Sequence, residues 1–188
     1  MIIPIREIYE MTEELKKTYD EKDLKKLAAQ LGILVNYFPM GQHQGSCKGF
    51  YMQVYDVKHI SINNELTLIE QYFILAHEFG HAMQNQKAVM GFVDHTILDR
   101  SDKMEIMANY FSADWIMDDK DVMDLVMSGM TFFEIASMLN VLPGLLAYKY
   151  HSMDVRGYKG LHSPIDVRSQ YLNEYQRPAR MAEDYLDN

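Results

Sequence analysis

Apolar residues in the first third of the chain recur with two different periods. Helical spacing is present over residues 4–18 and 21–31, and Gly32 then stands where glycine commonly ends a helix. Three β-rich runs follow, at residues 33–38, 50–55 and 59–62. The pattern therefore predicts two helices followed by a small three-stranded sheet.

Helical periodicity dominates the rest of the chain. Helices are predicted at residues 65–86, from 101 or 102 to 117, 120–128, 131–139 and 143–152. Asn63 or Asn64 can cap the first of these, and a capping box starts at Thr131. We expect a mostly helical α+β domain at residues 1–156, and a polar C-terminal extension at 157–188 that packs over the surface or is partly mobile.

The helix predicted at residues 65–86 contains the run His77-Glu78-Phe79-Gly80-His81. Histidines four positions apart lie on one face of a helix, so their imidazoles can hold a single Zn²⁺ ion. Glu78 would then lie close enough to accept a proton from a water molecule on that ion. The alternative is a surface helix with two ordinary histidines.

The residues around this motif favour burial of the helix. Phe73, Ile74 and Ala76 surround the histidine face with apolar groups, and a helix that is apolar nearly all round is usually buried. Buried histidines need partners, and a metal ion is one such partner. Gly80 weakens the helix by about 1 kcal/mol relative to alanine, which is plausible where another backbone packs closely against it.

A zinc site of this kind needs a third protein ligand. Gln84 and Lys87 stand where a metzincin has glycine and histidine, so that subclass is excluded. The third ligand must then lie further along the chain, on a second helix that crosses the first. The candidates are Asp94, His95, Asp99, Asp102, Glu105 and Asp114.

Glu105 is the preferred third ligand. Small residues share its helical face and would allow close approach to the histidine helix; they are Ala108, Asn109 and Ser112. Asn109 could in addition orient a ligand through a hydrogen bond. Asp102, about one turn earlier on nearly the same face, is the second choice, whereas Asp114 falls on roughly the opposite side.

Charge and composition restrict the class of protein. A net charge of −9 and a pI near 5.2 argue against general nucleic-acid binding, which needs clustered Lys and Arg. Residues 131–152 could form a helix-turn-helix, but its second helix carries Lys149 as its one basic residue, so helices that complete the core are the favoured interpretation.

The single cysteine, Cys47, allows no intramolecular disulfide. Neither a signal-peptide layout nor an apolar run of membrane-spanning length is present, and we expect a cytoplasmic protein with no membrane partner.

Four segments of the chain match a known family pattern. They are Tyr19-Asp20 with Leu24, Leu27, Ala28, Gly32 and Ile33; Ile60–Asn63; Phe73–His81; and Glu105–Ala113. On these segments the chain resembles the ImmA/IrrE family of metallopeptidases, over about residues 19–150. Two departures are Ser112, where the family usually has alanine, and Trp115–Asp118, where relatives often have Leu-Met-Pro.

The resemblance implies a zincin-like fold with His77, His81 and Glu105 on zinc and Glu78 as the catalytic residue. It also implies that the partner is a helix-turn-helix repressor of a phage, an integrative element or a stress response, which the protein cleaves or inactivates.

Three functional classes remain open: a zinc protease acting on a repressor, a zinc-containing protein that displaces a repressor without cutting, and a DNA-binding regulator. For the protease, analogy with other zincins predicts that the strand at residues 59–62 pairs with an extended substrate segment. Tyr148, Tyr150 and His151 are candidates for a hydrogen bond to the oxyanion.

Overall fold

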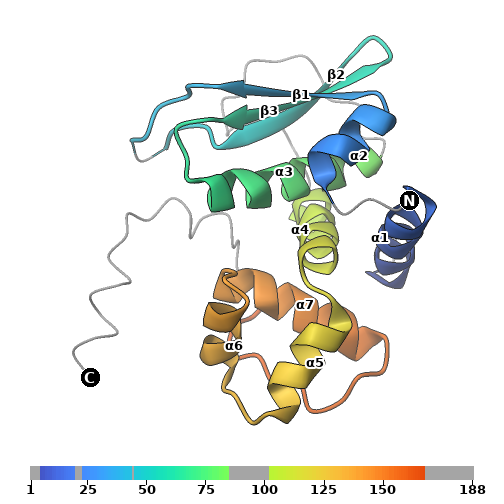
Figure 1. Ribbon diagram of the computed structural model, residues 1–188, viewed down its shortest axis with the longest axis vertical. Coiled ribbons are helices and arrows are strands. Elements are labelled where there is room, and N and C mark those ends of the chain that lie inside the picture. Colours follow the sequence, from blue (N-terminus) through green and yellow to red (C-terminus); the bar gives the residue numbers. More distant parts are fainter. Residues whose placement is uncertain (1–4, 20–22, 44, 85–101, 168–188) are drawn as a thin grey trace.

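The computed structural model describes residues 5–19, 23–43, 45–84 and 102–167, which form a mostly helical α+β fold with one small sheet (Figure 1). The elements of the first half are α1 (Ile5–Tyr19), α2 (Leu24–Gln30), β1 (Ile33–Phe38), β2 (Gly49–Val54) and β3 (Val57–Asn63). Those of the second half are α3 (Leu68–Met83), α4 (Asp102–Ile116), α5 (Asp119–Met127), α6 (Phe132–Met138) and α7 (Pro143–Val155). The type and order of the predicted elements are confirmed, and their ends differ by no more than a turn.

The sheet has the strand order β1-β3-β2, with β3 in the centre. β1 runs parallel to β3, from Ile33 opposite Lys58 to Phe38 opposite Asn63, whereas β2 is antiparallel to β3. Both sides of β3 are therefore hydrogen-bonded within the sheet. The prediction that residues 59–62 pair with a substrate strand is wrong, because a central strand has no free edge for a further strand.

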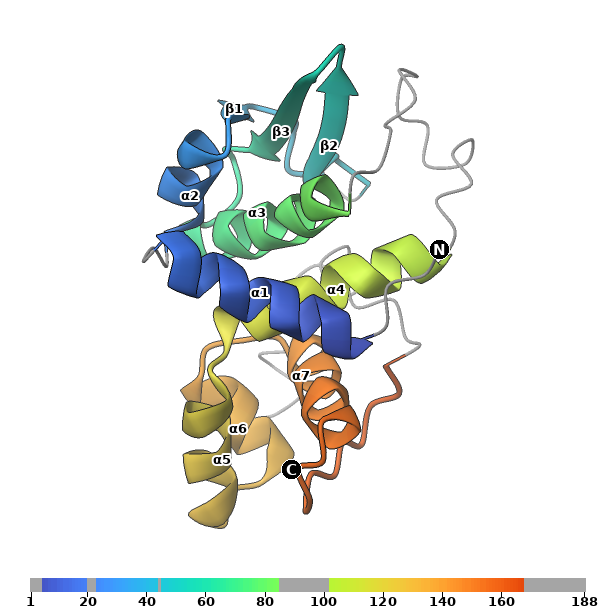
Figure 2. The same cartoon turned by 90° about the vertical axis from the view of Figure 1, so that its right-hand side faces the viewer.

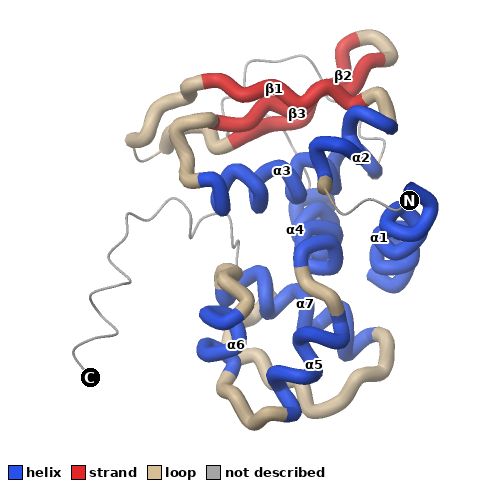
Figure 3. The backbone as a smooth tube through the Cα atoms, in the orientation of Figure 1, coloured by secondary structure: helices blue, strands red, loops and turns tan. Residues whose placement is uncertain are grey.

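The elements are stacked in layers, with the sheet at one end and α5, α6 and α7 at the other (Figures 1 and 3). One face of the sheet packs on α3, α3 packs on α4, and α4 packs on α1 and α7 (Figure 2). α4 thus lies in the middle of the molecule and contacts both the sheet-bearing half and the helical half. A site between α3 and α4 is therefore supported by the sheet on one side and by α1 and α7 on the other.

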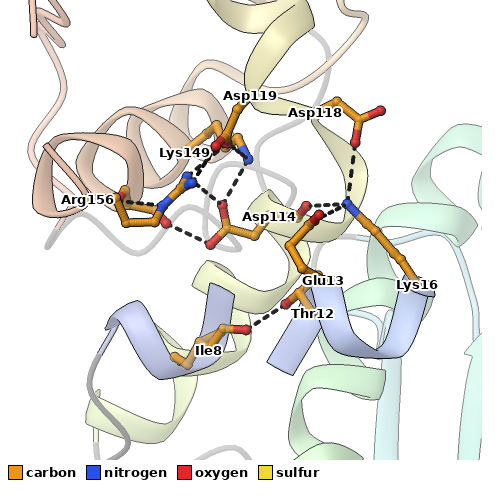
Figure 4. Close-up of polar contacts among 10 residues, drawn as sticks. Ile8, Thr12, Glu13, Lys16, Asp114, Asp118, Asp119, Lys149 and Arg156 are labelled. Atoms are coloured by element: carbon orange, nitrogen blue, oxygen red, sulfur yellow. Dashed lines mark hydrogen bonds and ion pairs between the residues drawn. The ribbon is translucent and has the colours of Figure 1, made fainter. Parts of the chain in front are cut away.

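A buried cluster of charges ties α4 to the helical half (Figure 4). Lys149 of α7 is 1% exposed, and its Nζ lies 2.9 Å from Asp114 Oδ1 and 2.7 Å from Asp119 Oδ1. Arg156 also pairs with both carboxylates, and its guanidinium lies 3.5 Å from the centre of the Tyr9 ring. Two acidic and two basic groups balance one another, as buried charges must. The cluster joins α1, α4, α5 and the end of α7.

The chain continues past α7 along the surface. Partly buried side chains of this segment pack against the core; they are Tyr158, Leu161, Ile165 and Val167. The described part of the expected C-terminal extension therefore packs on the domain, while residues 168–188 lie outside the described residues. Across all the described ranges, no helix is long and apolar enough to cross a membrane.

Candidate metal centre

The helix α3 begins at a capping box rather than at the predicted asparagines. The Thr67 hydroxyl accepts from the Glu70 backbone N–H, and the Glu70 carboxylate accepts from the Thr67 N–H and hydroxyl. Asn63 is fully buried, and its side chain instead binds backbone groups of Met40 and Cys47. The prediction of an Asn63 or Asn64 cap is therefore wrong: Asn63 fixes the loop before β2.

The predicted burial of the motif helix is confirmed. Every residue of α3 from Phe73 to Ala82 is buried, including His77 at 1% and His81 at 0% exposure. Gly80 faces α4 so closely that a Cβ atom there would lie 3.0 Å from the Ala108 Cα. The sequence predicted, from Gly80 and Ala108, that a second helix packs closely against α3. The structure confirms this close approach.

The α3–α4 contact brings three potential metal ligands together. His77 Nε2 lies 3.1 Å from His81 Nε2 and 3.1 Å from Glu105 Oε2, and His81 Nε2 lies 3.4 Å from Glu105 Oε1. Zinc held tetrahedrally by bonds of about 2.0–2.1 Å keeps its ligand atoms about 3.3–3.4 Å apart. The three side chains therefore have the chemistry and the mutual spacing of a zinc site, with Glu105 about one-third exposed at its mouth.

Asn109 contacts His77 at the ring nitrogen that is not used for the metal. Its Oδ1 lies 2.9 Å from His77 Nδ1, and the asparagine is 4% exposed. When Nδ1 donates its proton to this oxygen, the opposite nitrogen, Nε2, carries the lone pair that a metal needs. The orienting hydrogen bond predicted for Asn109 is thus present in the structure.

The electrostatics of the three ligands are strongly coupled. Burial alone would lower the pKa of His77, but its hydrogen bond to Glu105 and the nearby Glu105 and Glu78 charges raise it above its ordinary value. Burial alone would raise the pKa of Glu105, yet hydrogen bonds from His77 and His81 hold it far below its ordinary range. The carboxylate is therefore kept charged, which is the form that binds a cation.

Glu78 lies next to the cluster but is not part of it. The residue is 5% exposed, its charge acts on His77, and its Oε2 is buried without a hydrogen-bond partner. A buried carboxylate oxygen that no protein group satisfies is costly, and such groups are concentrated where a ligand or a reacting molecule supplies the missing partner. This is the environment expected for a group that handles a proton beside a metal.

Of the other candidate ligands, Asp114 is the one whose side chain the structure describes, and it lies away from the cluster. Among the described residues, His77, His81 and Glu105 form the one group of three suited to hold a metal ion. Asp94, His95 and Asp99 lie outside the described residues, and Asp102 is the first residue of α4. Asp114 lies in the charge cluster with Lys149, as its predicted position on the far side of the helix requires.

The three α7 residues considered as oxyanion donors have different surroundings. Tyr148 is 1% exposed, and its ring meets the Tyr110 ring edge-on, with the centroids 5.0 Å apart. Tyr150 packs edge-on against Phe132, and His151 Nδ1 lies 2.6 Å from the Tyr110 hydroxyl. The sequence offered all three residues as oxyanion donors without choosing among them, and that role stays a prediction.

The structure argues against the helix-turn-helix interpretation, because the one basic residue of the second helix is not available to contact DNA. Lys149, the single Lys or Arg within α7, is buried between Asp114 and Asp119. A side chain held this way does not reach a phosphate at the surface. Residues 131–152 instead complete the core, through Ile135, Leu145 and Leu146.

Comparison with known proteins agrees with this geometry. The model of the IrrE N-terminal-like domain, a peptidase family, matches residues 28–151. The chain belongs to this family. It is also 32% identical, over 136 residues, to the "Uncharacterized immunity region protein 2" of Bacillus phage phi105, a match that covers 72% of this chain and 84% of the phage protein.

Family membership covers the whole metal centre, because the matched residues include α3, α4 and most of α7. The resemblance drawn from sequence motifs is therefore confirmed. The family is of metallopeptidase type, and the His77, His81 and Glu105 cluster is where such a protein would hold its metal. Ser112, which stands where the family usually has alanine, is fully buried, and its hydroxyl has no hydrogen-bond partner.

Proposed function

We propose that this protein is a zinc-dependent peptidase that cleaves a helix-turn-helix repressor. The observation that carries the proposal is the spacing of the three ligand side chains, whose nearest nitrogen and oxygen atoms lie 3.1, 3.1 and 3.4 Å apart, next to a buried glutamate with an unpaired oxygen. Zinc bound by this set would act as a Lewis acid, lowering the pKa of a coordinated water and polarising a peptide carbonyl.

The roles of the protein side chains follow from their positions. Asn109 holds His77 with Nε2 toward the cluster, and the charged Glu105 closes it from α4. Glu78 has a free carboxylate oxygen in a dry environment, so it serves as the general base that takes a proton during attack on the peptide carbonyl. The same carboxyl then returns that proton to the amine that leaves.

The substrate part of the proposal rests on the phage relative. That protein is described as an immunity region protein, and the family resemblance implies a helix-turn-helix repressor as the partner. A repressor substrate would place the reaction in the cytoplasm, where repressors meet DNA. An extended substrate segment would pair with an outer edge of the sheet, on β1 or β2, because β3 is occupied on both sides.

Zinc content and cleavage are tested separately. Purified wild-type protein and the Glu78→Gln, Glu105→Ala and His81→Ala variants are analysed by elemental mass spectrometry. Wild type and Glu78→Gln should carry one zinc ion per chain, and the two ligand variants should lose most of it. If the wild-type protein takes up no zinc even when zinc is supplied in excess, the proposal of a zinc enzyme is excluded.

Cleavage is assayed with a helix-turn-helix repressor encoded beside the gene. Mass spectrometry should find repressor fragments with wild-type protein and none with Glu78→Gln, because loss of a general base typically slows such a step by about 10²–10⁴-fold. If wild type and Glu78→Gln release the repressor from DNA equally and no fragments form, the protein acts by binding and the protease proposal fails.

A further inference from the structure

The last turn of α3 carries the second histidine ligand. α3 ends at Met83, and Gln84 is its C-cap, so His81 lies within one turn of the helix end. The carbonyl groups of a last turn have no partner within the helix, and helix ends fray unless other groups bind them. His77 stands a full turn earlier and is also held by Asn109. The position of His81 therefore depends on what holds the end of α3.

A lysine from the sheet binds this helix end. Lys58 Nζ lies 2.6 Å from the backbone oxygen of Ala82, the residue directly after His81. The closing bond of the helix itself, from the Gln84 N–H to the Gly80 oxygen, is longer, at 3.3 Å. An ammonium group forms shorter and stronger hydrogen bonds than a neutral donor, and its positive charge also suits the negative end of the helix dipole. Lys58 thus makes the shorter of these two contacts at the end of α3.

The sheet directs the Lys58 side chain toward α3. Side chains alternate along a strand, so Lys58, Ile60 and Ile62 stand on one face of β3. Ile62 is opposite Gly49 of β2, which packs against Ile74 of α3. That face is therefore the one that lies on α3 (Figure 2). Burial there lowers the pKa of Lys58, and an ammonium that is partly removed from water interacts more strongly with a carbonyl oxygen.

We propose that Lys58 is a positioning residue of the metal centre: by binding the Ala82 carbonyl it keeps the last turn of α3, and with it His81, in the place where this ligand meets His77 and Glu105. This inference rests on the proposed zinc site. It gives β3, which contributes none of the three ligands, a share in the metal affinity.

The test compares zinc affinity in Lys58→Met with a matched control, Lys16→Met. Lys16 of α1 makes the same kind of contact, since its Nζ lies 3.0 Å from the Asp114 backbone oxygen in the last turn of α4 (Figure 4). That end of α4 is more than two turns away from Glu105. Both substitutions remove an ammonium group and keep a long apolar stem, but only Lys58 binds next to a ligand.

Affinity is measured by competition with a chromophoric chelator, on samples whose circular dichroism matches that of wild type. Lys58→Met should bind zinc about 3–10-fold more weakly, less than the loss of about 10–100-fold that is typical of a direct partner of a ligand. Lys16→Met should bind zinc as wild type does, although it lowers the free energy of unfolding. Lys58→Arg, which keeps a charged donor, should recover most of the affinity.

The sign of the effect separates position from charge. A positive charge near a bound dication repels it, so loss of the Lys58 charge by itself would tighten zinc binding. A weaker affinity in Lys58→Met therefore reports a loss of position. The absorption spectrum of the cobalt-substituted protein gives a second readout, because it depends on the geometry of the ligands. Lys58→Met should change this spectrum, and Lys16→Met should not.

The failure of this inference is distinct from the failure of the zinc site. If wild type binds zinc and Lys58→Met binds it equally well or more tightly, the inference is wrong while the zinc site stands. An equal loss in Lys58→Met and Lys16→Met would also overturn it, since general destabilisation would explain both. If Lys58→Met does not fold, Lys58→Gln, which keeps an uncharged donor on a shorter stem, takes its place under the same criteria. A wild-type protein that binds no zinc would refute the proposed function and this inference together.

Discussion

Gly80 of α3 and Ala108 of α4 lie at the point where the two helices of the metal centre come closest. A Cβ atom at position 80 would lie 3.0 Å from the Ala108 Cα and 3.1 Å from the Phe111 Cβ. These neighbours belong to a packed helix and cannot move away as a flexible side chain would. The ligands His77, His81 and Glu105 can meet only because the helices approach this closely.

Gly80→Ala should therefore destabilise the protein, although alanine favours a helix by about 1 kcal/mol. Overpacking a well-filled interior costs about 1–3 kcal/mol, so we expect a net loss, measured by urea unfolding of the metal-free protein. Gly80→Val should lose more, and both should weaken zinc binding as α3 and α4 separate. A Gly80→Ala protein more stable than wild type would show that the contact is not restrictive.

Lys149→Met should be strongly destabilising. The substitution keeps the length of the side chain but leaves Asp114, which is fully buried, without its 2.9 Å partner. Breaking a buried ion pair in this way costs about 3–5 kcal/mol, which a urea titration measures directly. Lys120→Met is the matched control, because Lys120 pairs with Asp124 at the exposed surface and should have no measurable effect. Equal effects of the two substitutions would contradict the importance of the buried cluster.

Acid should weaken the same cluster through Asp119. Burial alone would raise the pKa of Asp119, but Arg156 and Lys149 hold it well below its ordinary value of 3.8. A carboxyl whose pKa is depressed by folding adds stability above the unfolded pKa, and this stability is lost as the pH falls toward the folded pKa. We therefore expect wild type to be more stable than Asp119→Asn at pH 7, with the difference shrinking below about pH 4.

The measurement is the free energy of unfolding of both metal-free proteins between pH 7 and pH 3. Glu105, whose pKa is depressed, and His77, whose pKa is raised, are present in both and largely cancel in the difference. A difference that stays constant down to pH 3 would show that Asp119 does not titrate with a depressed pKa in the folded protein.

Ser112→Ala should leave stability unchanged or raise it by up to about 1 kcal/mol, because the buried hydroxyl makes no hydrogen bond and its removal ends the cost of burying an unsatisfied polar group. Ser152→Ala provides the contrast. The Ser152 hydroxyl is equally buried but donates to Asp114 Oδ2 at 2.7 Å, and its loss should cost about 1.5–3 kcal/mol. Thermal unfolding of the two variants side by side distinguishes these outcomes, and a clear loss in Ser112→Ala would mean that its hydroxyl has a partner after all.

The metal centre was predictable because its signals are local. His77 and His81 are one helical turn apart, and the small residues that follow Glu105 mark the face of α4 that meets α3. Gly80 pointed to the same contact from the other helix. Periodicity and motif spacing report on single helices and on the faces that they bury, and this site consists of two such faces.

What the sequence could not predict depends on distant packing. Three β-rich runs in a row do not show that β3 is central, because the pairing of β1 with β3 rather than with β2 leaves no local pattern in the sequence. Asn63 and Thr67 are both good caps, and only the buried loop contacts of Asn63 decide between them. Lys149 and Asp114 are 35 positions apart, with nothing in their local sequence to indicate a pair.

The balance of charge in that buried cluster limits how this protein can diverge. Asp114 and Asp119 are matched one for one by Lys149 and Arg156, so no member can be exchanged for a neutral residue without stranding an opposite charge. Among relatives we expect these four positions to change in pairs, an acid together with a base, or not at all. Metal binding constrains the ligand residues, whereas each of these four residues is constrained by the charges of the other three.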